Sequence, residues 1–210
     1  MERVICLFIG YLFGLFQTGY IYGKLHGIDI RQHGSGNSGS TNVLRVMGVK
    51  SGAVVFLGDF SKTLIPCLLT RFWFQDQPEI MYLMILYTGF GVILGHNFPF
   101  YMNFKGGKGI AATAGLLVSL DLRVTLLCLA AFVILVAWTR YVSLGSIVVL
   151  ILFFLSMVYM GMTGAYGVGE MYVTEFCLMA AVIMVMGIWR HRVNIGRLLK
   201  GTENKIGSKK

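Results

Sequence analysis

Charged residues are scarce in this chain of 210 residues: they make up 13% of the composition, against 56% hydrophobic residues. The mean hydropathy is +0.73. A water-soluble domain of this size needs far less apolar surface for its core, so this balance excludes a soluble globular fold. Long apolar runs recur along the whole chain and leave no room for a separate soluble domain. We therefore expect residues 1–210 to form a single membrane domain.

Acidic side chains are also few, and they do not cluster. Of the nine Asp and Glu residues, only Asp29 and Glu203 fall near the polar segments described below. The four cysteines lie far apart in apolar runs, without the CxxC or Cys/His spacings that suit zinc. The sequence predicts no metal site, no cofactor and buried, reduced thiols.

Seven apolar runs are near the length of about 20 residues that crosses a bilayer as a helix. They are residues 4–22, 52–74, 80–100, 109–122, 124–138, 142–163 and 171–189. The first is too long for a signal-peptide core and is expected to stay as an anchor. The fourth and fifth are short and separated by Asp121 and Arg123, so an incomplete hairpin or one long span are alternatives. The expected fold is all-α and polytopic, with about seven transmembrane helices.

The basic residues predict the orientation, because short cytoplasmic loops carry the excess of Lys and Arg. Fourteen of the eighteen follow the odd-numbered runs, which places the N-terminus outside and the C-terminus in the cytoplasm. This asymmetry also explains the net charge of +9, so nucleic-acid binding is not expected. The fourteen are Lys24, Arg31, Arg45, Lys50, Lys105, Lys108, Arg140, Arg190, Arg192, Arg197, Lys200, Lys205, Lys209 and Lys210.

The first polar segment on the basic side, residues 34–45, combines glycines with hydroxyl and amide side chains. Glycines let backbone N–H groups turn inward, and the guanidinium of Arg45 can donate two parallel hydrogen bonds to an oxyanion. A flexible Gly/Ser linker is the alternative. A GxGxxG pattern also occurs here, but it lies between membrane spans and not in a βαβ unit, which excludes a dinucleotide site. The residues assigned to an anion site are Gly34, Ser35, Gly36, Asn37, Thr41, Asn42 and Arg45.

The second polar segment, residues 95–109, ends in a glycine loop that opens an apolar helix. Such a loop offers N–H groups, a positive helix dipole end and two lysines to a phosphate. It is not a Walker A loop, because Met102 stands where the first glycine is required, so nucleoside triphosphate hydrolysis is unsupported. The residues assigned to phosphate binding are Lys105, Gly106, Gly107, Lys108 and Gly109.

Two further polar segments lie at residues 140–146 and 190–197. Arg140 and Ser143 begin the sixth run, where Arg140 alone would be an interfacial anchor. His191 and Asn194 are three residues apart, on one face of a helix, and can meet the same ligand; an incidental histidine beside a basic anchor is the alternative. Within the second run, Asp59 and Lys62 have the same spacing and predict a structural ion pair.

Together with residues 201–205, these four segments resemble the PlsY family of bacterial acyl-phosphate:glycerol-3-phosphate acyltransferases, over nearly the whole chain. The resemblance implies a seven-span enzyme of the bacterial inner membrane with its active site facing the cytoplasm. It implies transfer of a fatty acyl group from acyl phosphate to the sn-1 hydroxyl of glycerol 3-phosphate, giving lysophosphatidic acid and inorganic phosphate in the first acylation of phospholipid synthesis. Its partners would be these substrates and membrane lipids, and we expect a monomer.

The resemblance assigns catalysis to Ser35, Arg45, Lys108, His191 and Asn194. Substrate or phosphate binding is assigned to Gly34, Gly36, Asn37, Thr41, Asn42, Lys105, Gly106, Gly107, Gly109, Arg140, Ser143 and Arg192. Val193 stands where the family has a glutamate, which argues against a carboxylate partner for His191. Either His191 or a substrate phosphate accepts the hydroxyl proton, and we favour a positioning role for the histidine.

A transporter for organic phosphates is the rival hypothesis, because anion-binding helix starts in a small bundle would serve transport too. Transporters place their sites near the midplane and often contain inverted repeats. In this sequence the polar segments all fall on one side and no duplication is evident, which favours the enzyme.

Overall fold

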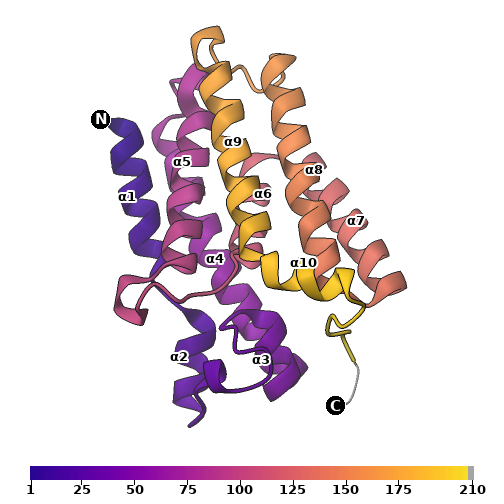
Figure 1. Ribbon diagram of the computed structural model, residues 1–210. Coiled ribbons are helices and arrows are strands. Elements are labelled where there is room, and N and C mark those ends of the chain that lie inside the picture. Colours follow the sequence, from indigo (N-terminus) through magenta and orange to yellow (C-terminus); the bar gives the residue numbers. More distant parts are fainter. Residues whose placement is uncertain (208–210) are drawn as a thin grey trace.

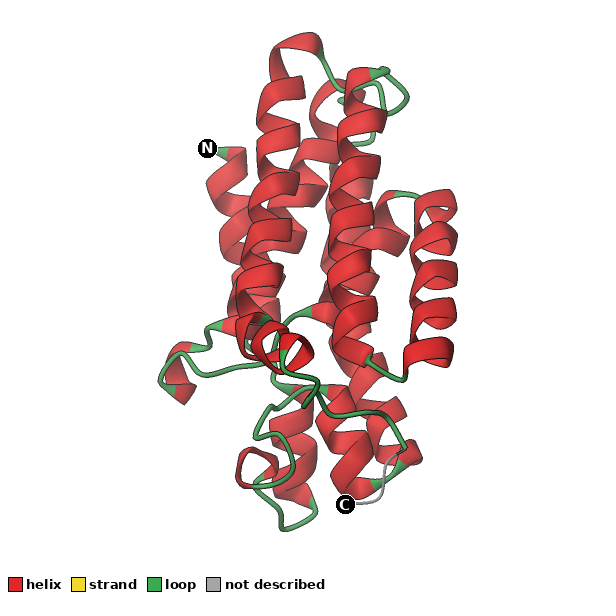
Figure 2. Cartoon of the chain, turned by 45° about the vertical axis from the view of Figure 1, so that its right-hand side comes forward, coloured by secondary structure: helices red, strands yellow, loops and turns green. Residues whose placement is uncertain are grey.

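A computed structural model describes residues 1–207 of the chain. All regular structure within that range is helical, and Figure 2 shows helices joined by loops. The helices are α1 (Glu2–Gly14), α2 (Thr18–Leu25), α3 (Ser40–Met47), α4 (Val49–Trp73), α5 (Pro78–Asn97), α6 (Ile110–Leu120), α7 (Leu122–Thr139), α8 (Val142–Met162), α9 (Glu170–Arg190) and α10 (Arg192–Leu199), with short 3-10 turns at Ile30–Gln32 and Phe100–Met102.

Six segments within residues 1–207 are long and apolar enough to cross a membrane. They are Glu2–Leu25, Val49–Trp73, Pro78–Met102, Leu122–Thr139, Val142–Met162 and Glu170–Arg190. The predicted class, an all-helical polytopic membrane protein, is confirmed. The count of seven crossings and the orientation of the termini stay predictions.

α5 is the central helix of the bundle and packs against α1, α4, α6 and α9. Its seam with α1 has glycines on both sides: Gly10 and Gly14 face the backbone of α5, and Gly91 and Gly95 face the backbone of α1. A side-chain carbon at any of these positions would overlap a carbonyl oxygen across the seam. Small residues four apart let membrane helices approach closely enough for van der Waals contact to hold them together.

The first predicted span, residues 4–22, is interrupted in the structure: α1 ends at Gly14 and α2 begins four residues later. The break leaves carbonyl groups without helical partners, and lipid cannot satisfy them. Lys62 Nζ donates to the carbonyls of Phe16 (2.6 Å) and Gly14 (3.4 Å), and it pairs with Asp59 at 2.9 Å. The predicted ion pair in the second span is confirmed, and the same lysine closes the break in the first.

The predicted fourth run is a helix of 11 residues, α6, which is about 16 Å long and hence roughly half of the hydrocarbon thickness. Its last carbonyls, those of Ser119 and Leu120, accept hydrogen bonds of 2.7 and 2.9 Å from Arg71. Asp121 then begins α7 by accepting from the backbone N–H of Arg123 at 2.7 Å. The runs on either side of Asp121 are therefore two helices and not one long span.

The polar segments gather at one end of the bundle. In Figure 1, α2, α3 and α10 lie at the end where the C-terminal tail is found, while the N-terminus and the α8–α9 connection lie toward the other. The sequence predicted an irregular loop for residues 34–45, whereas the structure forms α3 from residue 40 onward. Lys209 and Lys210, which entered the charge argument, lie outside the described residues.

Candidate active site

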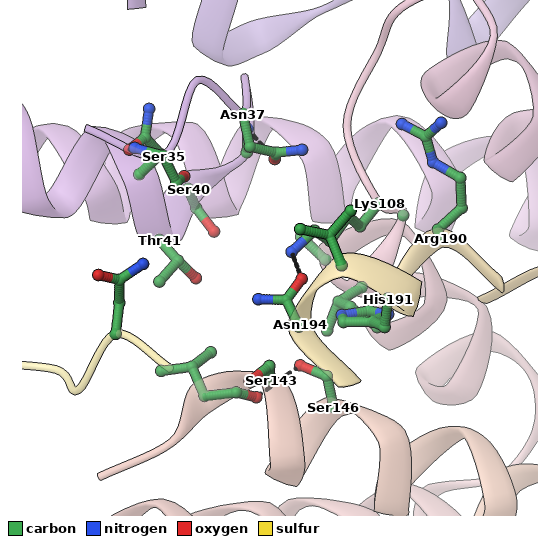
Figure 3. Close-up of a pocket in the computed structure, with 18 of the residues that line it drawn as sticks. Ser35, Asn37, Ser40, Thr41, Lys108, Ser143, Ser146, Arg190, His191 and Asn194 are labelled. Atoms are coloured by element: carbon green, nitrogen blue, oxygen red, sulfur yellow. Dashed lines mark hydrogen bonds between the residues drawn. The ribbon is translucent and has the colours of Figure 1, made fainter. Parts of the chain in front are cut away.

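A cavity of about 430 Å³ opens at the end of the bundle where the polar segments meet (Figure 3). All four segments contribute to its wall, although they are separated by up to about 160 residues along the chain. Twelve residues assigned from the sequence line it: Ser35, Gly36, Asn37, Thr41, Asn42, Arg45, Lys108, Gly109, Ser143, His191, Arg192 and Asn194. Gly34, Lys105, Gly106, Gly107 and Arg140 do not.

The loop before α3 owes its shape to Asn42. The side-chain oxygen of this residue accepts from the backbone N–H of Ser35 (2.8 Å), and its amide group donates to the carbonyls of Ile30 (3.2 Å) and His33 (3.0 Å). Asn42 is therefore a brace with its hydrogen bonds used within the chain. Figure 3 shows the side chains that the brace presents: Ser35, Asn37, Ser40 and Thr41 lie on one side of the cavity, across from Asn194.

The glycine loop before α6 is held by its own hydrogen bonds. The N–H groups of Gly106 and Gly107 donate to the carbonyls of Asn97 and His96, at 3.1 Å each. The carbonyls of the two glycines accept from Arg190, at 2.9 and 2.6 Å. Both amides are thus engaged within the protein, and the loop presents only Lys108 and Gly109 to the cavity.

Lys108 reaches into the cavity and donates a hydrogen bond of 2.5 Å to the side-chain oxygen of Asn194. Burial lowers the pKa of the Lys108 ammonium from its ordinary value to about 8, and the cations Arg197, Arg45 and Arg190 act in the same direction, whereas Glu203 opposes it. The lysine is therefore charged at neutral pH but close to losing its proton. An anion bound beside it would restore the higher pKa, because opposite charges favour the charged form.

His191 lines the cavity at the junction of α9 and α10 and is 2% exposed. Its Nδ1 atom lies 2.8 Å from the carbonyl of Gly187, an acceptor, which assigns the proton to Nδ1 and leaves the Nε2 lone pair free. Burial lowers the pKa of His191 to about 4, and the positive charges of Lys108 and Arg190 contribute to the same shift. The imidazole is therefore a neutral hydrogen-bond acceptor at neutral pH.

A carboxylate that the sequence did not single out completes the site. Glu203, from the tail after α10, accepts from the hydroxyl of Ser143 (3.1 Å) and from the side-chain amide of Asn194 (2.7 Å). Within residues 1–207, no hydrogen bond joins Glu203 to either ring nitrogen of His191. The tail sequence was part of the resemblance, but nothing in its spacing indicated that it folds back onto α8.

Ser40, which belongs to the first polar segment, also lines the cavity. Ser146, Arg190 and Arg197 line it too; they belong to the recognised segments but were not assigned to the site. The cations on the wall outnumber the carboxylates, because Asp59 is paired with Lys62 and only Glu203 remains near Lys108. Such a concave, positive surface concentrates anions. No group of three or more His, Cys, Asp or Glu side chains able to hold a metal ion occurs in residues 1–207.

Apolar side chains also line the cavity. They include Phe56 of α4, Ile110 and Ala111 of α6, and Phe132 of α7. One cavity thus combines cationic and hydrocarbon lining. This combination suits a ligand that has an anionic head and an apolar chain.

Comparison with known proteins agrees with this geometry. A model of the family described as glycerol-3-phosphate acyltransferase matches residues 4–201. The glycerol-3-phosphate acyltransferases of Alkaliphilus metalliredigens and Halalkalibacterium halodurans are 40% and 41% identical to this chain, each over 100% of it and 98% of their own length. A crystal structure of PlsY (YgiH), an integral membrane glycerol 3-phosphate acyltransferase in its glycerol 3-phosphate form, has a TM-score of 0.84 at 36% identity, over 99% of this chain and 96% of that one. The lysophosphatidic acid form has a TM-score of 0.82 at 35% identity. This chain belongs to the glycerol-3-phosphate acyltransferase family of PlsY, the integral membrane enzymes of phospholipid synthesis.

Proposed function

We propose that this enzyme transfers a fatty acyl group from acyl phosphate to the sn-1 hydroxyl of glycerol 3-phosphate, at the cytoplasmic face of a bacterial inner membrane, and acts as a monomer. The products are lysophosphatidic acid and inorganic phosphate. The observation that carries this proposal is one cavity lined both by the cations Arg45, Lys108 and Arg192 and by apolar side chains. Both substrates are anions, and the donor also carries a hydrocarbon chain.

Binding of two phosphates is the main task of the protein, because an acyl phosphate is already an activated mixed anhydride. Holding the hydroxyl oxygen next to the acyl carbonyl carbon removes most of the entropic part of the barrier. Arg45, Lys108 and Arg192 supply positive charge for the two phosphates, while Ser35 and Asn37 supply neutral hydrogen bonds. The solved relative in its glycerol 3-phosphate form supports the assignment of this anion.

In the reaction, the sn-1 hydroxyl oxygen attacks the acyl carbonyl carbon, and the bond between that carbon and the bridging phosphate oxygen breaks. The electron pair leaves with the phosphate, and the hydroxyl proton ends on phosphate as well. His191 orients the hydroxyl by accepting its hydrogen bond at Nε2, because an imidazole with a pKa of about 4 is a weak base. Lys108, which donates a hydrogen bond to Asn194, stabilises negative charge on the leaving phosphate.

The test is an assay of the purified protein in lipid nanodiscs with palmitoyl phosphate and glycerol 3-phosphate, without added metal. We expect inorganic phosphate and lysophosphatidic acid to form one to one. Lys108→Ala and Arg45→Ala should abolish both products, whereas Lys50→Ala, an exposed lysine at the same end of the bundle, is the matched control and should not. Palmitoyl-coenzyme A and palmitoyl-acyl carrier protein replace the donor in parallel. Product from a thioester alone would overturn the proposed donor, and phosphate uptake into vesicles without product would favour the transporter.

A further inference from the structure

Arg140 does not line the cavity, although the sequence had assigned it to phosphate binding. Its guanidinium donates to the carbonyl of Ile206 from Nε (3.0 Å) and from Nη2 (2.8 Å), and its own carbonyl accepts from the N–H of Ile206 at 2.9 Å. Three hydrogen bonds therefore join the end of α7 to one residue of the tail. Arg140 makes them from a left-handed backbone conformation, with φ of 63°.

The tail, residues 201–207, forms a strap that is held at two points. At its start, the N–H of Thr202 donates to the carbonyl of Arg197 on α10 at 2.8 Å. At its end, Arg140 binds Ile206, which also lines an apolar groove along α3 and α4. Figure 1 shows this tail, in yellow, leaving α10 and running beside the lower ends of α7 and α8.

Between its two anchors the strap enters the active site. Glu203 accepts from Ser143 and Asn194, and the carbonyl of Asn204 accepts from Arg45 at 3.4 Å. Three residues assigned to the site, Ser143, Asn194 and Arg45, thus have hydrogen bonds that depend on where the strap lies. Since Arg140 fixes the far end, it controls the position of Glu203 without touching the cavity itself.

We propose that Arg140 is a positioning residue that anchors the strap, so that Glu203 orients Asn194 toward Lys108, and that it binds no substrate phosphate. This inference rests on the proposed function, because the site that the strap completes is the glycerol 3-phosphate site. The side chain of Asn194 carries one donor end and one acceptor end. Glu203 holds the donor end, which leaves the oxygen for Lys108.

Release of the strap has a consequence for charge as well as for geometry. Lys108 is faced by Glu203 from the strap and by Arg45 from α3, Arg190 from α9 and Arg197 from α10, with neutral His191 alongside. Glu203 is the one anion of this set, and it favours the charged ammonium. When the strap leaves, Lys108 should lose its proton at a lower pH.

Arg140→Gly tests the anchor, because glycine adopts the left-handed backbone without strain and removes the side chain that donates to Ile206. A chain that ends at Lys205 removes the other partner. A chain that ends at Gly207 is the matched control, since it keeps Ile206. We expect Arg140→Gly and the chain ending at Lys205 each to lower kcat/KM for glycerol 3-phosphate about tenfold, the equivalent of one charge-assisted hydrogen bond. Combining the two changes should produce no further loss, because they break the same contact.

Two other readouts do not depend on the size of the activity loss. Hydrogen exchange of residues 201–207 should be faster in Arg140→Gly, and Arg140→Lys should recover part of the protection because an ammonium still donates to Ile206. The alkaline fall of kcat/KM should begin at a lower pH in Arg140→Gly than in the wild-type enzyme. A structural defect elsewhere would not move that pH.

If the losses in kcat/KM from the two changes multiply in the combined variant, the inference is overturned. Direct phosphate binding by Arg140 is then favoured. Normal activity of the chain that ends at Lys205 would overturn it too. If the wild-type protein makes no product, the proposed function fails; hydrogen exchange in Arg140→Gly then still decides whether Arg140 anchors the strap.

Discussion

Lys108 and Asn194 are joined by a hydrogen bond of 2.5 Å, although 86 residues separate them in the chain. One comes from the loop before α6 and the other from α10, after the last long helix. The bond places the ammonium at the centre of the cationic side of the cavity.

Asn194→Ala should lower kcat/KM for glycerol 3-phosphate about tenfold to a hundredfold, because both Lys108 and Glu203 lose a hydrogen-bond partner in a buried site. Steady-state kinetics with palmitoyl phosphate as donor measures this. Asn194→Asp should be at least as damaging, since a second carboxylate would lie beside Glu203 and repel phosphate. Normal kinetics in both variants would contradict the role given to this contact.

The activity should depend on pH through Lys108. The folded-state pKa of about 8 means that the ammonium is present below pH 8 and is lost as the pH rises through that value. Since phosphate binding needs the charge, kcat/KM for glycerol 3-phosphate should fall above about pH 8. Lys108→Arg should weaken activity but remove the alkaline fall, because a guanidinium stays charged. An unchanged fall in that variant would assign the titration to another group.

His191→Ala should reduce kcat about tenfold if the imidazole only orients the hydroxyl, whereas loss of a general base typically costs about 10² to 10⁴. Because the pKa of His191 is about 4, the wild-type enzyme should show no acidic limb between pH 5 and 7 from this residue. Exposed His26, at the end of α2, provides the control in His26→Ala. Turnover close to normal in His191→Ala would remove even the orienting role.

Lys62→Met should destabilise the fold by about 3–5 kcal/mol, because Asp59 would keep a buried charge without its partner. The carbonyls at the α1–α2 break would also lose their donor. Thermal unfolding in detergent measures the loss, with Lys50→Met as the surface control. The double variant Asp59→Asn, Lys62→Met should be less destabilised than Lys62→Met alone, and the opposite order would refute the pairing argument.

Cysteine labelling tests the orientation that the basic residues predict. A membrane-impermeant maleimide should label Asp76→Cys, between α4 and α5, from outside the cell, and Lys50→Cys only after the membrane is opened. Both positions are exposed, whereas Cys6, Cys67 and Cys128 are buried. The reverse pattern would place the active site outside and exclude the proposed cellular topology.

Hydropathy predicted the membrane class and most helix positions, because a long apolar run in lipid has no alternative to a helix. It did not predict the break after Gly14, since the donor that makes the break tolerable, Lys62, comes from another helix. The glycine seam between α1 and α5 is also a property of two helices at once. Neither feature can be recognised from the sequence of one apolar run alone.

The residue types of the candidate site were predictable from the sequence, but their hydrogen-bond partners were not. Ser35, Arg45, Lys108 and His191 carried their chemistry in the sequence, and the structure brings them to one cavity. Whether a polar group is free or already used depends on partners far away in the chain. The N–H groups of Gly106 and Gly107 donate to carbonyls at the end of α5, and Glu203 of the strap binds Ser143 of α8.

The place of Glu203 in chain order has a consequence for biosynthesis. Every helix long enough to cross the membrane precedes it. Insertion of these helices therefore does not require the residue that bridges Ser143 and Asn194. A premature stop codon just after α10 would leave a protein that inserts normally and accumulates. Assays of insertion or abundance would score it as intact, although its active site would lack Glu203.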